Sequence, residues 1–263
     1  MITVLGASGF VGSHLGAYLD RSPHDFQAVP RGADIPIGPL GHVIYCIGVT
    51  GDFPERPWEA VDAHVCSLLE LVRQASFESL LYVSSVRLYA GGSGPAREED
   101  ELRLNPLRAG DLYNASKALG ETITLSLGAR GRVARPSNVY GRGQRNSFIA
   151  EIVDEAHAEG AVTFRSPPAS SRDYVSVDDV ARLLVEIALR GRERIYNVAS
   201  GVGTTNAELG SIVSGATGCA IRYAPDAVPS PVPPIDTSRI REEFGFAPAA
   251  LQDALSPLLE RRA

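Results

Sequence analysis

Short apolar segments recur along the first half of the chain, and the first of them, residues 2–5, shows no polar alternation. They occupy residues 2–5, 26–29, 42–49, 80–84 and 131–135. Because strands buried on both faces of a sheet carry such continuous apolar runs, these segments predict parallel strands. Between them, apolar residues recur at helical spacing in residues 13–19, 58–75 and 111–127. The alternation of short strands and amphipathic helices indicates an α/β fold with a parallel sheet.

The rhythm of the pattern changes after about residue 138. The elements expected beyond that point are helices at residues 146–160 and 177–189, strands at 161–165 and 194–198, and a terminal helix. We expect the strand at 194–198 to rejoin the sheet. The chain is therefore predicted to form two interleaved parts: a sheet domain from residues 1–137 plus 172–198, and a smaller C-terminal lobe from residues 138–171 plus 199–263.

Composition and charge exclude several classes of protein. The 263 residues are 44% hydrophobic and carry a net charge of −6, which argues against a nucleic-acid backbone or an anionic membrane as the main partner. The longest apolar run has about seven residues, whereas a membrane span needs about 20. The N-terminal residues read as a strand rather than a signal peptide, so we expect a cytoplasmic protein. The three cysteines form no CxxC pair and no cluster with histidine, so we expect no metal site and no disulfide.

A Gly-x-x-Gly-x-x-Gly motif leaves the first predicted strand and opens the first predicted helix. The spacing alone is a weak signal in a chain with 26 glycines, but its position is informative. Glycines at such a turn let a pyrophosphate approach the N–H groups at a helix N-terminus. The alternative is an ordinary strand–helix turn. The residues of this loop that we expect to bind a dinucleotide are Gly6, Ser8, Gly9, Phe10, Val11 and Gly12.

The residue that ends the second strand of such a domain selects the cofactor. An acidic residue there bonds the ribose hydroxyl of NAD, and an arginine accommodates the 2′-phosphate of NADP. Arg31 stands at this tip, and Asp34 follows three residues later. We therefore predict that NADP(H) is preferred, while a ribose contact from Asp34 would permit NAD(H). The alternative for Arg31 is a solvated surface side chain.

Tyr113 and Lys117 lie four residues apart on one predicted helix and therefore share a face. Of the 25 Lys and Arg residues, Lys117 is the single lysine. An adjacent ammonium favours the phenolate and lowers the pKa of a tyrosine, which suits that tyrosine for proton exchange with a substrate oxygen. Ser84 and Ser85 end the fourth strand, at the edge where open α/β sheets bind ligands. A hydroxyl there could hold the reacting oxygen against Tyr113. We also expect Tyr113 and Lys117 to contact the cofactor, with Lys117 hydrogen-bonded to the nicotinamide ribose.

Five segments, in order and spacing, resemble the extended short-chain dehydrogenases/reductases of the NAD-dependent epimerase/dehydratase type. They are GASGFVG, SSVRLYA, YNASK, ARPSNVYG and SRDYVSVDDVA. The resemblance covers nearly the whole chain. It implies a Rossmann-like, doubly wound parallel sheet with a smaller, interleaved C-terminal substrate lobe. It also implies an NAD(P)-dependent enzyme that acts on a nucleotide-activated sugar.

The same resemblance assigns roles to individual residues. Ser85 rather than Ser84 would be the catalytic hydroxyl, Tyr113 the acid/base and Lys117 its partner. Asn138 would line the sugar pocket, and Arg172 would contact the nucleotide diphosphate, although an ion pair with Asp173 or Asp178 is the alternative for Arg172. The resemblance further implies a homodimer through the helices at residues 58–75 and 111–127.

The chain departs from the family pattern at several places, among them residues 232–236, which lack the second diphosphate-binding arginine that the family often has there. Only about a dozen residues separate the second strand from the third, too few for a helical crossover, so the usual third strand and helix are expected to be cut down. Within that short segment, Asp34 and Ile35 stand in for the usual adenine-contacting pair. His64 replaces the asparagine that the family usually has near the active site, and it is either a packed core residue or a site residue.

Membership of this family does not by itself determine which reaction the protein catalyses. Dehydratases of this type carry Asp-Glu directly after the catalytic hydroxyl, whereas Val86 and Arg87 stand here, so dehydration is disfavoured. We expect Arg87 to contact the substrate instead. Arg31 favours NADPH-dependent reduction of a 4-keto sugar. An NAD-dependent 4-epimerase and a non-catalytic NADP(H)-binding sensor are the alternatives.

Overall fold

A six-stranded parallel sheet forms the centre of one half of the molecule. The computed structural model describes residues 1–36, 38–49, 51, 53–92, 94–108, 110–228 and 233–260. Its central strands are ordered β2-β1-β3-β4-β5-β9, and every neighbouring pair is parallel. These strands are β1 (Ile2–Leu5), β2 (Phe26–Val29), β3 (His42–Tyr45), β4 (Ser79–Val83), β5 (Gly131–Pro136) and β9 (Ile195–Val198). The predicted α/β class is confirmed, as is the return of the last strand to the sheet.

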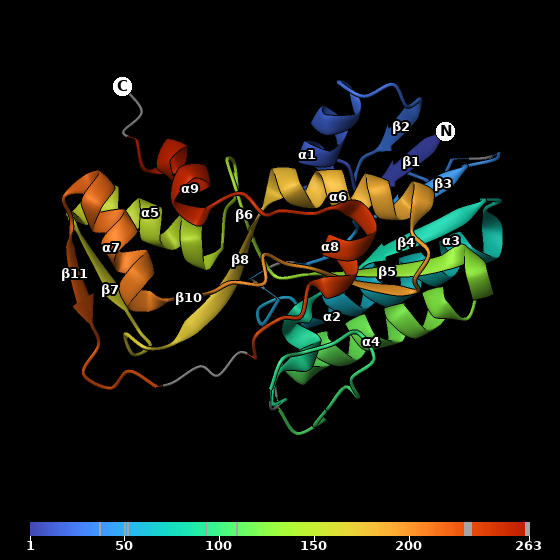
Figure 1. Cartoon of the computed structure of the whole chain (residues 1–263). Helices are drawn as coiled ribbons and strands as arrows, with labels where there is room; N and C mark the ends of the chain where they lie inside the picture. Colours follow the sequence, from blue (N-terminus) through green and yellow to red (C-terminus); the bar gives the residue numbers. More distant parts are fainter. Residues whose placement is uncertain are drawn as a thin grey trace.

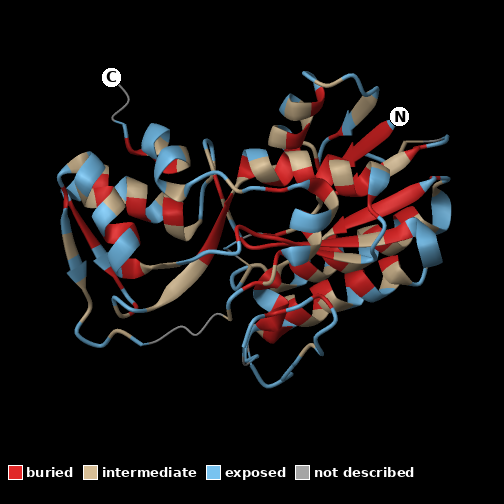
Figure 2. Ribbon diagram, viewed as in Figure 1, coloured by how far each residue is buried: buried red, intermediate tan, exposed pale blue. Residues whose placement is uncertain are grey.

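Helices cover both faces of this sheet (Figure 1). One face carries α1 (Phe10–Leu19), α6 (Val177–Arg190) and α8 (Ser238–Phe244), and the other carries α3 (Ser67–Gln74) and α4 (Asp111–Leu125). Successive side chains of a strand point to opposite faces of the sheet. Val4 therefore joins the core between the sheet and helices α1 and α6, and Leu5 joins the core between the sheet and α3. The strands inside the sheet are buried along most of their length (Figure 2), whereas the edge strand β2 is partly exposed.

The helix expected at residues 58–75 is divided by a wider turn. It consists of α2 (Pro57–Val61), the π-helical turn η1 (Asp62–Cys66) and α3. A π turn accommodates an extra residue in the helix and rotates the turns after it, and such turns are frequent at functional sites. The turn brings His64 into the interior of the protein, where it is fully buried.

Strands β2 and β3 are joined without a helix. β2 pairs only with β1 at the edge of the central sheet, and β3 lies on the other side of β1. In the connection, Pro39 forms an isolated parallel bridge with Ser76. This confirms that the usual third strand and helix are absent from residues 30–41, apart from Ile37, which lies outside the described residues.

The second half of the molecule is a smaller group of strands and helices around a core of its own (Figure 1). Its strands are β6 (Asn138–Tyr140), β7 (Ala161–Phe164), β8 (Ser171–Ser176), β10 (Gly203–Thr205) and β11 (Ala220–Tyr223). Its helices are α5 (Phe148–Glu159), α7 (Asn206–Thr217) and α9 (Leu251–Leu259). Two short turns, η2 (Val86–Tyr89) and η3 (Gly128–Arg130), complete the described elements.

Several of these elements were not predicted from the sequence. β6 and β10 have only three residues each, and β8 is rich in polar residues, so none shows a clear apolar period. β8 pairs with β6 and β10 rather than with the central sheet. The division of the chain into two domains with the boundaries given above stays a prediction.

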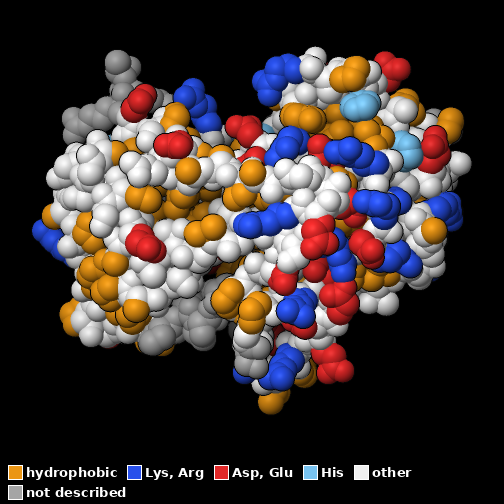
Figure 3. Space-filling view, viewed as in Figure 1, with side chains coloured by type: hydrophobic (Ala, Val, Ile, Leu, Met, Phe, Trp, Pro, Cys, Tyr) orange, Lys and Arg blue, Asp and Glu red, His pale blue; other side chains and the backbone are white. Residues whose placement is uncertain are grey.

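The surface carries both signs of charge. On the face shown in Figure 3, acidic and basic side chains intermingle over the central-sheet half, and fewer charges cover the second half. Within the described residues, no helix is both long and apolar enough to cross a membrane.

Candidate active site

The glycine loop connects β1 to α1 and is shaped by close backbone approaches. Gly6 has a φ of +83°, and a side chain there would meet the backbone of Ile47. A side chain at Gly12 would collide with the Gly6 carbonyl oxygen, which accepts the Gly9 N–H at 3.0 Å. Gly9 is the N-cap of α1, and no side chain caps this helix end. The first N–H groups of α1 can therefore bind a phosphate, so the loop fits the pyrophosphate of a dinucleotide.

The other residues expected in this loop have separate tasks. The Ser8 hydroxyl accepts the Arg31 N–H at 3.0 Å and so ties the loop to the end of β2. Phe10 makes an edge contact with His14, and Val11 packs against the core beneath α6. These contacts hold the loop at the carboxyl edge of the sheet, where open α/β sheets bind ligands.

Arg31 spans from the end of β2 to the loop that follows β3. Its guanidinium donates a hydrogen bond to the Gly48 carbonyl oxygen at 2.7 Å. Its side chain, although exposed, is therefore directed along the ligand-binding edge. Asp34 is exposed. Ile35 packs against the core and borders a hollow with Pro39 and Ser76, residues that precede β3 and β4, so its contact with adenine stays a prediction.

Ser85 and Tyr113 meet at the same edge. Ser85 is the N-cap of η2, where its hydroxyl accepts the Arg87 N–H at 3.1 Å. The Ser85 hydroxyl lies close enough to the Tyr113 phenol to act on its pKa in the lowering direction. Ser84 instead is buried, and its hydroxyl has no hydrogen-bond partner among the described residues. The structure thus brings together the serine and tyrosine that the family pattern pairs.

The pKa of Tyr113 differs from the expectation. Burial raises the pKa of Tyr113 to about 12. The Arg87 guanidinium and the Ser85 hydroxyl act on this pKa in the lowering direction. Lys117 was expected to lower this pKa, but its Nζ donates to the Val83 carbonyl oxygen at 2.8 Å and lies 5.0 Å from the centre of the Tyr82 ring. Burial lowers the pKa of Lys117 itself to about 7. The expectation was wrong because it neglected desolvation of both groups.

Two further side chains enclose Tyr113. The Phe53 ring lies 4.5 Å from the Tyr113 ring, and the Arg87 guanidinium lies 4.8 Å from the centre of Phe53 and 6.0 Å from that of Tyr113. Arg87 is thus placed beside the phenol, as expected for a substrate-contacting residue. Phe53 was missed because it stands in a loop without periodicity, and no sequence signal marks it.

The substrate-side residues predicted in the smaller half lie on β6 and β8. The Asn138 amide donates to the Asp173 carbonyl oxygen at 2.8 Å. The Arg172 guanidinium lies over the Phe148 ring at 4.0 Å and acts on the pKa of the nearby Tyr174 hydroxyl in the lowering direction. Among the described ion pairs, none joins Arg172 to the two acids considered as its alternative partners.

Those two acids are engaged elsewhere. The Asp173 carboxylate accepts hydrogen bonds from Ser137, Ser200 and Gly201, and Asp178 lies 3.6 Å from His14. Arg172 also has a buried Nη1 without a hydrogen-bond partner in the described part of the chain. This leaves guanidinium donors of Arg172 for an anionic ligand.

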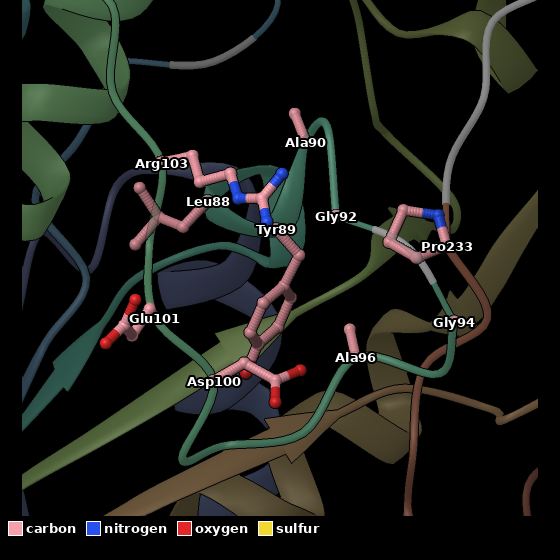
Figure 4. A pocket seen from close by; sticks show the side chains of 10 residues that line it. All are labelled: Leu88, Tyr89, Ala90, Gly92, Gly94, Ala96, Asp100, Glu101, Arg103 and Pro233. Atoms are coloured by element: carbon pink, nitrogen blue, oxygen red, sulfur yellow. The ribbon is translucent and has the colours of Figure 1, made fainter.

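A small cavity lies next to η2 and is lined in part by Tyr89 (Figure 4). Its volume is about 30 Å³, and its lining includes Leu88, Tyr89, Asp100, Arg103 and Pro233. This is room for a few water molecules and not for a sugar. The cavity does not include the Ser85, Tyr113 and Lys117 side chains.

Comparisons with known proteins agree with this geometry. The sequence model of the NAD dependent epimerase/dehydratase family matches residues 37–199. The chain is 26% identical to dTDP-4-dehydro-6-deoxy-D-allose reductase from a Streptomyces species, over 97% of this chain and 93% of that protein. It is 31% identical to dTDP-glucose 4,6-dehydratase from Streptomyces griseus, over 72% of this chain and 60% of that protein. Among solved structures, RMD from Pseudomonas aeruginosa complexed with NADPH has the same fold, with a TM-score of 0.79 at 23% identity over 98% of this chain and 97% of that one.

Proposed function

The chain belongs to the NAD dependent epimerase/dehydratase family, and from this we propose that it is an NADPH-dependent reductase of a 4-keto nucleotide sugar. The observation that carries the proposal is the placement of Ser85 close to Tyr113 at the carboxyl edge of the sheet, the edge that also carries the glycine loop. A hydroxyl that can hold a carbonyl oxygen and a phenol that can protonate it are the groups a ketone reduction requires. The relative with the widest coverage given above is itself a sugar reductase.

Each residue of the site has a defined task in this proposal. The glycine loop and the α1 N-terminus hold the cofactor pyrophosphate, and Arg31 holds the 2′-phosphate. When bound, the nicotinamide supplies the hydride. Ser85 orients the substrate oxygen, and Tyr113 donates the proton to it. Arg172 binds the nucleotide diphosphate as a guanidinium that matches phosphate oxygens.

Dehydration and epimerisation fit the site less well. No acidic side chain directly follows Ser85, because Val86 and Arg87 occupy these positions. Epimerases keep NAD bound and return the hydride to the same sugar, so a 2′-phosphate site at Arg31 disfavours them. Asp34 is the residue that favours the epimerase alternative, because an exposed carboxylate close to Arg31 can bond a bare ribose. A cytoplasmic location belongs to the same proposal.

The test is a mass-spectrometric screen of nucleotide 4-keto sugars incubated with the protein and either NADPH or NADH. We expect a reduced sugar, with one NADPH oxidised for each sugar converted. Interconversion of two stereoisomers without net cofactor consumption would assign the protein to the epimerases. Cofactor binding without any sugar-dependent hydride transfer would indicate the sensor alternative.

A further inference from the structure

His64 is a buried titratable side chain for which the proposed reaction has no use. It lies in the π-helical turn Asp62–Cys66 and has no exposed surface. Its ring makes an edge contact with the Tyr113 ring, with 5.1 Å between the ring centres and an angle of 86°. A buried polar group without function would be costly unless both of its nitrogen atoms were hydrogen-bonded.

Both nitrogen atoms are in fact engaged, and their partners define the tautomer. The His64 Nδ1 lies 2.9 Å from the Ser116 hydroxyl oxygen. That hydroxyl donates its hydrogen to the Tyr113 carbonyl oxygen at 2.9 Å, so it must accept from Nδ1–H. On the other side, the Val49 N–H donates to Nε2 at 3.4 Å, so Nε2 carries no hydrogen. The two bonds agree on a neutral imidazole protonated at Nδ1.

The charges around the ring favour the same neutral form. The titratable groups that face His64 are Lys117 and Tyr113 on α4 and Arg31 from the end of β2. Burial first, and then the positive charges of Lys117 and Arg31, lower the pKa of His64 to about 2. A protonated imidazole would also lose the Val49 bond, since Nε2 would then be a donor facing a donor.

The partners of His64 lie on two separate elements of the active site. Ser116 belongs to α4, between Tyr113 and Lys117, whereas Val49 belongs to the loop after β3. The neighbouring residue Gly48 packs against His64 and Lys117. A Cβ at this position would lie 3.4 Å from His64 Nε2 and 3.5 Å from Lys117 Nζ. Its carbonyl oxygen accepts the bond from Arg31. This peptide therefore forms part of the ligand-binding edge close to the catalytic side chains.

We propose that His64 is a positioning residue: as a neutral imidazole protonated at Nδ1, it ties the Gly48–Val49 peptide to helix α4 and fixes that wall of the cofactor site against Tyr113 and Lys117. The inference rests on the proposed function only in naming the cofactor. The tautomer and the tie between the two elements are properties of this chain's own residues.

Two substitutions at His64 test its bonds with Ser116 and Val49 separately, because each keeps one of the two bonds. The amide nitrogen of an asparagine reaches the position of Nδ1, so His64→Asn keeps a donor for Ser116 and removes the acceptor for Val49. The amide oxygen of a glutamine reaches the position of Nε2, so His64→Gln keeps the acceptor for Val49. His24→Asn, at an exposed position in the loop before β2, is the matched control.

The first measurement is amide hydrogen exchange at Val49, which needs neither cofactor nor substrate. We expect exchange in His64→Asn to be about 10-fold faster or more, because a buried N–H loses its acceptor. His64→Gln and His24→Asn should stay close to the wild type. Equal protection of Val49 in His64→Asn and the wild type would overturn the tie between loop and helix.

The second measurement is ¹⁵N NMR of the histidine rings between pH 5 and 8, with the His64 signals assigned by their loss in either variant. We expect a neutral ring protonated at Nδ1 throughout. A ring that titrates in this range, or one protonated at Nε2, overturns the proposal, and this measurement on the wild type stands even if a variant fails to fold.

The link to the cofactor is tested by fluorescence titration with NADPH and with NADH. We expect the Kd to rise about 10-fold in His64→Asn and less than about threefold in His64→Gln. A wild type that binds neither dinucleotide would refute the proposed function while leaving the exchange and NMR results to decide on His64. A wild type that binds, with both variants unchanged, would overturn the positioning role alone.

Discussion

Tyr113 owes its environment to side chains from three other segments of the chain. The Phe53 ring packs against the Tyr113 ring, and the His64 ring makes an edge contact with it. The Arg87 guanidinium lies 6.0 Å from the centre of the Tyr113 ring. The Ser85 hydroxyl lies close to the Tyr113 phenol and acts on its pKa in the lowering direction. At the scale of the residue, this site is a phenol held protonated by burial, with a hydroxyl and a cation beside it. Burial keeps Tyr113 in the form that holds the proton but also makes it a weaker acid, and Arg87 and Ser85 act against that shift of its pKa.

The first prediction concerns this proton. Tyr113→Phe should lower the rate of sugar reduction by about 10²–10⁴, because the variant keeps the ring contacts but loses the donor. The Kd for NADPH should stay nearly unchanged, since the hydroxyl is not among the phosphate-binding groups. Steady-state kinetics and fluorescence titration measure both effects. Tyr18→Phe, in α1 and outside the site, is the control, and near-normal activity of Tyr113→Phe would contradict the mechanism.

The second prediction concerns the pH dependence of stability. The pKa of Lys117 is about 7 in the folded protein and 10.5 ordinarily, so between these values the unfolded chain binds a proton that the folded protein lacks. The contribution of Lys117 to the free energy of unfolding should therefore increase with pH, by up to about 1.4 kcal/mol per pH unit. Above pH 9 the buried Cys46 thiol acts in the opposite direction, because its pKa is raised to about 12 from an ordinary 9.0.

Urea unfolding of the wild type and Lys117→Met at pH 7, 8 and 9 isolates this contribution. Groups other than Lys117 are common to both proteins, so the difference in their free energies of unfolding should change with pH in favour of the wild type. A difference that stays constant across this range would show that Lys117 is charged in the folded protein.

At the scale of elements, the short β2–β3 connection determines how the cofactor edge is built. Without an intervening strand and helix, β2 is the edge strand, and Arg31 extends from its end to the Gly48 carbonyl oxygen. The guanidinium is therefore already directed along the carboxyl edge of the sheet. A 2′-phosphate can replace the carbonyl as its partner with a stronger, charge-assisted bond.

The third prediction follows from this arrangement. Arg31→Ala should weaken NADPH binding by about 10–150-fold, because a hydrogen bond between charged groups is worth about 1.5–3 kcal/mol. NADH binding should change much less. Titration of both cofactors measures the ratio, with Arg21→Ala at the end of α1 as the control. Equal affinity of the wild type and Arg31→Ala for NADPH would remove Arg31 from the site.

Helix α4 is fixed to the sheet by a buried ion pair. Arg135 on β5 donates two hydrogen bonds to the Glu121 carboxylate, at 2.9 and 2.6 Å, and a third to the Tyr89 hydroxyl at 2.6 Å. Tyr89 in turn donates to Asn197 at 2.7 Å. The network connects the helix that carries Tyr113 with the turn that begins at Ser85. It thereby fixes the distance between the two.

The fourth prediction tests this pair. Arg135→Met should lower the free energy of unfolding by about 3–5 kcal/mol, because it leaves the Glu121 charge buried and unpaired. Combining it with Glu121→Leu should recover most of the loss. Denaturant unfolding of the single and double variants measures both. Arg97→Met, which breaks the more exposed pair with Asp236, should change stability by less than about 1 kcal/mol. A double variant no better than the single one would contradict the argument.

At the scale of the whole molecule, apolar side chains remain exposed on the helices expected to form a dimer. Trp58 on α2 is 74% exposed, and Leu112 and Leu119 on α4 are 36% and 49% exposed. The two helices pack against each other, so these side chains can form one apolar surface. A second copy of the chain related by a two-fold axis would cover it.

The fifth prediction is therefore a homodimer at micromolar concentration, measured by light scattering. Leu119→Glu should shift the protein to the monomer, because a charge at the centre of a self-complementary interface is met by its own copy. Leu107→Glu, at a 93% exposed position outside these helices, should leave the dimer intact. A monomeric wild type would rule the dimer out.

The alternation of apolar runs and helical periods by itself determined the α/β class, the six central strands in approximate extent, and the position of the glycine loop. These features depend on local pattern and on burial of whole elements, which the order of residues encodes directly. Spacing on one helix likewise placed Tyr113 and Lys117 on a common side. Of the short strands in the smaller half, β7 was predicted, whereas β6, β8, β10 and β11 were not found, because they are too short or too polar to show a period.

Only the tertiary structure decided which groups surround the catalytic side chains. Phe53, Gly48 and Val49 reach the site from a loop, and the partners of His64 are far from it in sequence. The direction of the pKa shift of Tyr113 was also decided there, because desolvation depends on what packs around a group and not on its neighbours along a helix. A linear pattern names the residues that carry the chemistry, but their protonation is set by burial and charge, which exist only once distant segments meet.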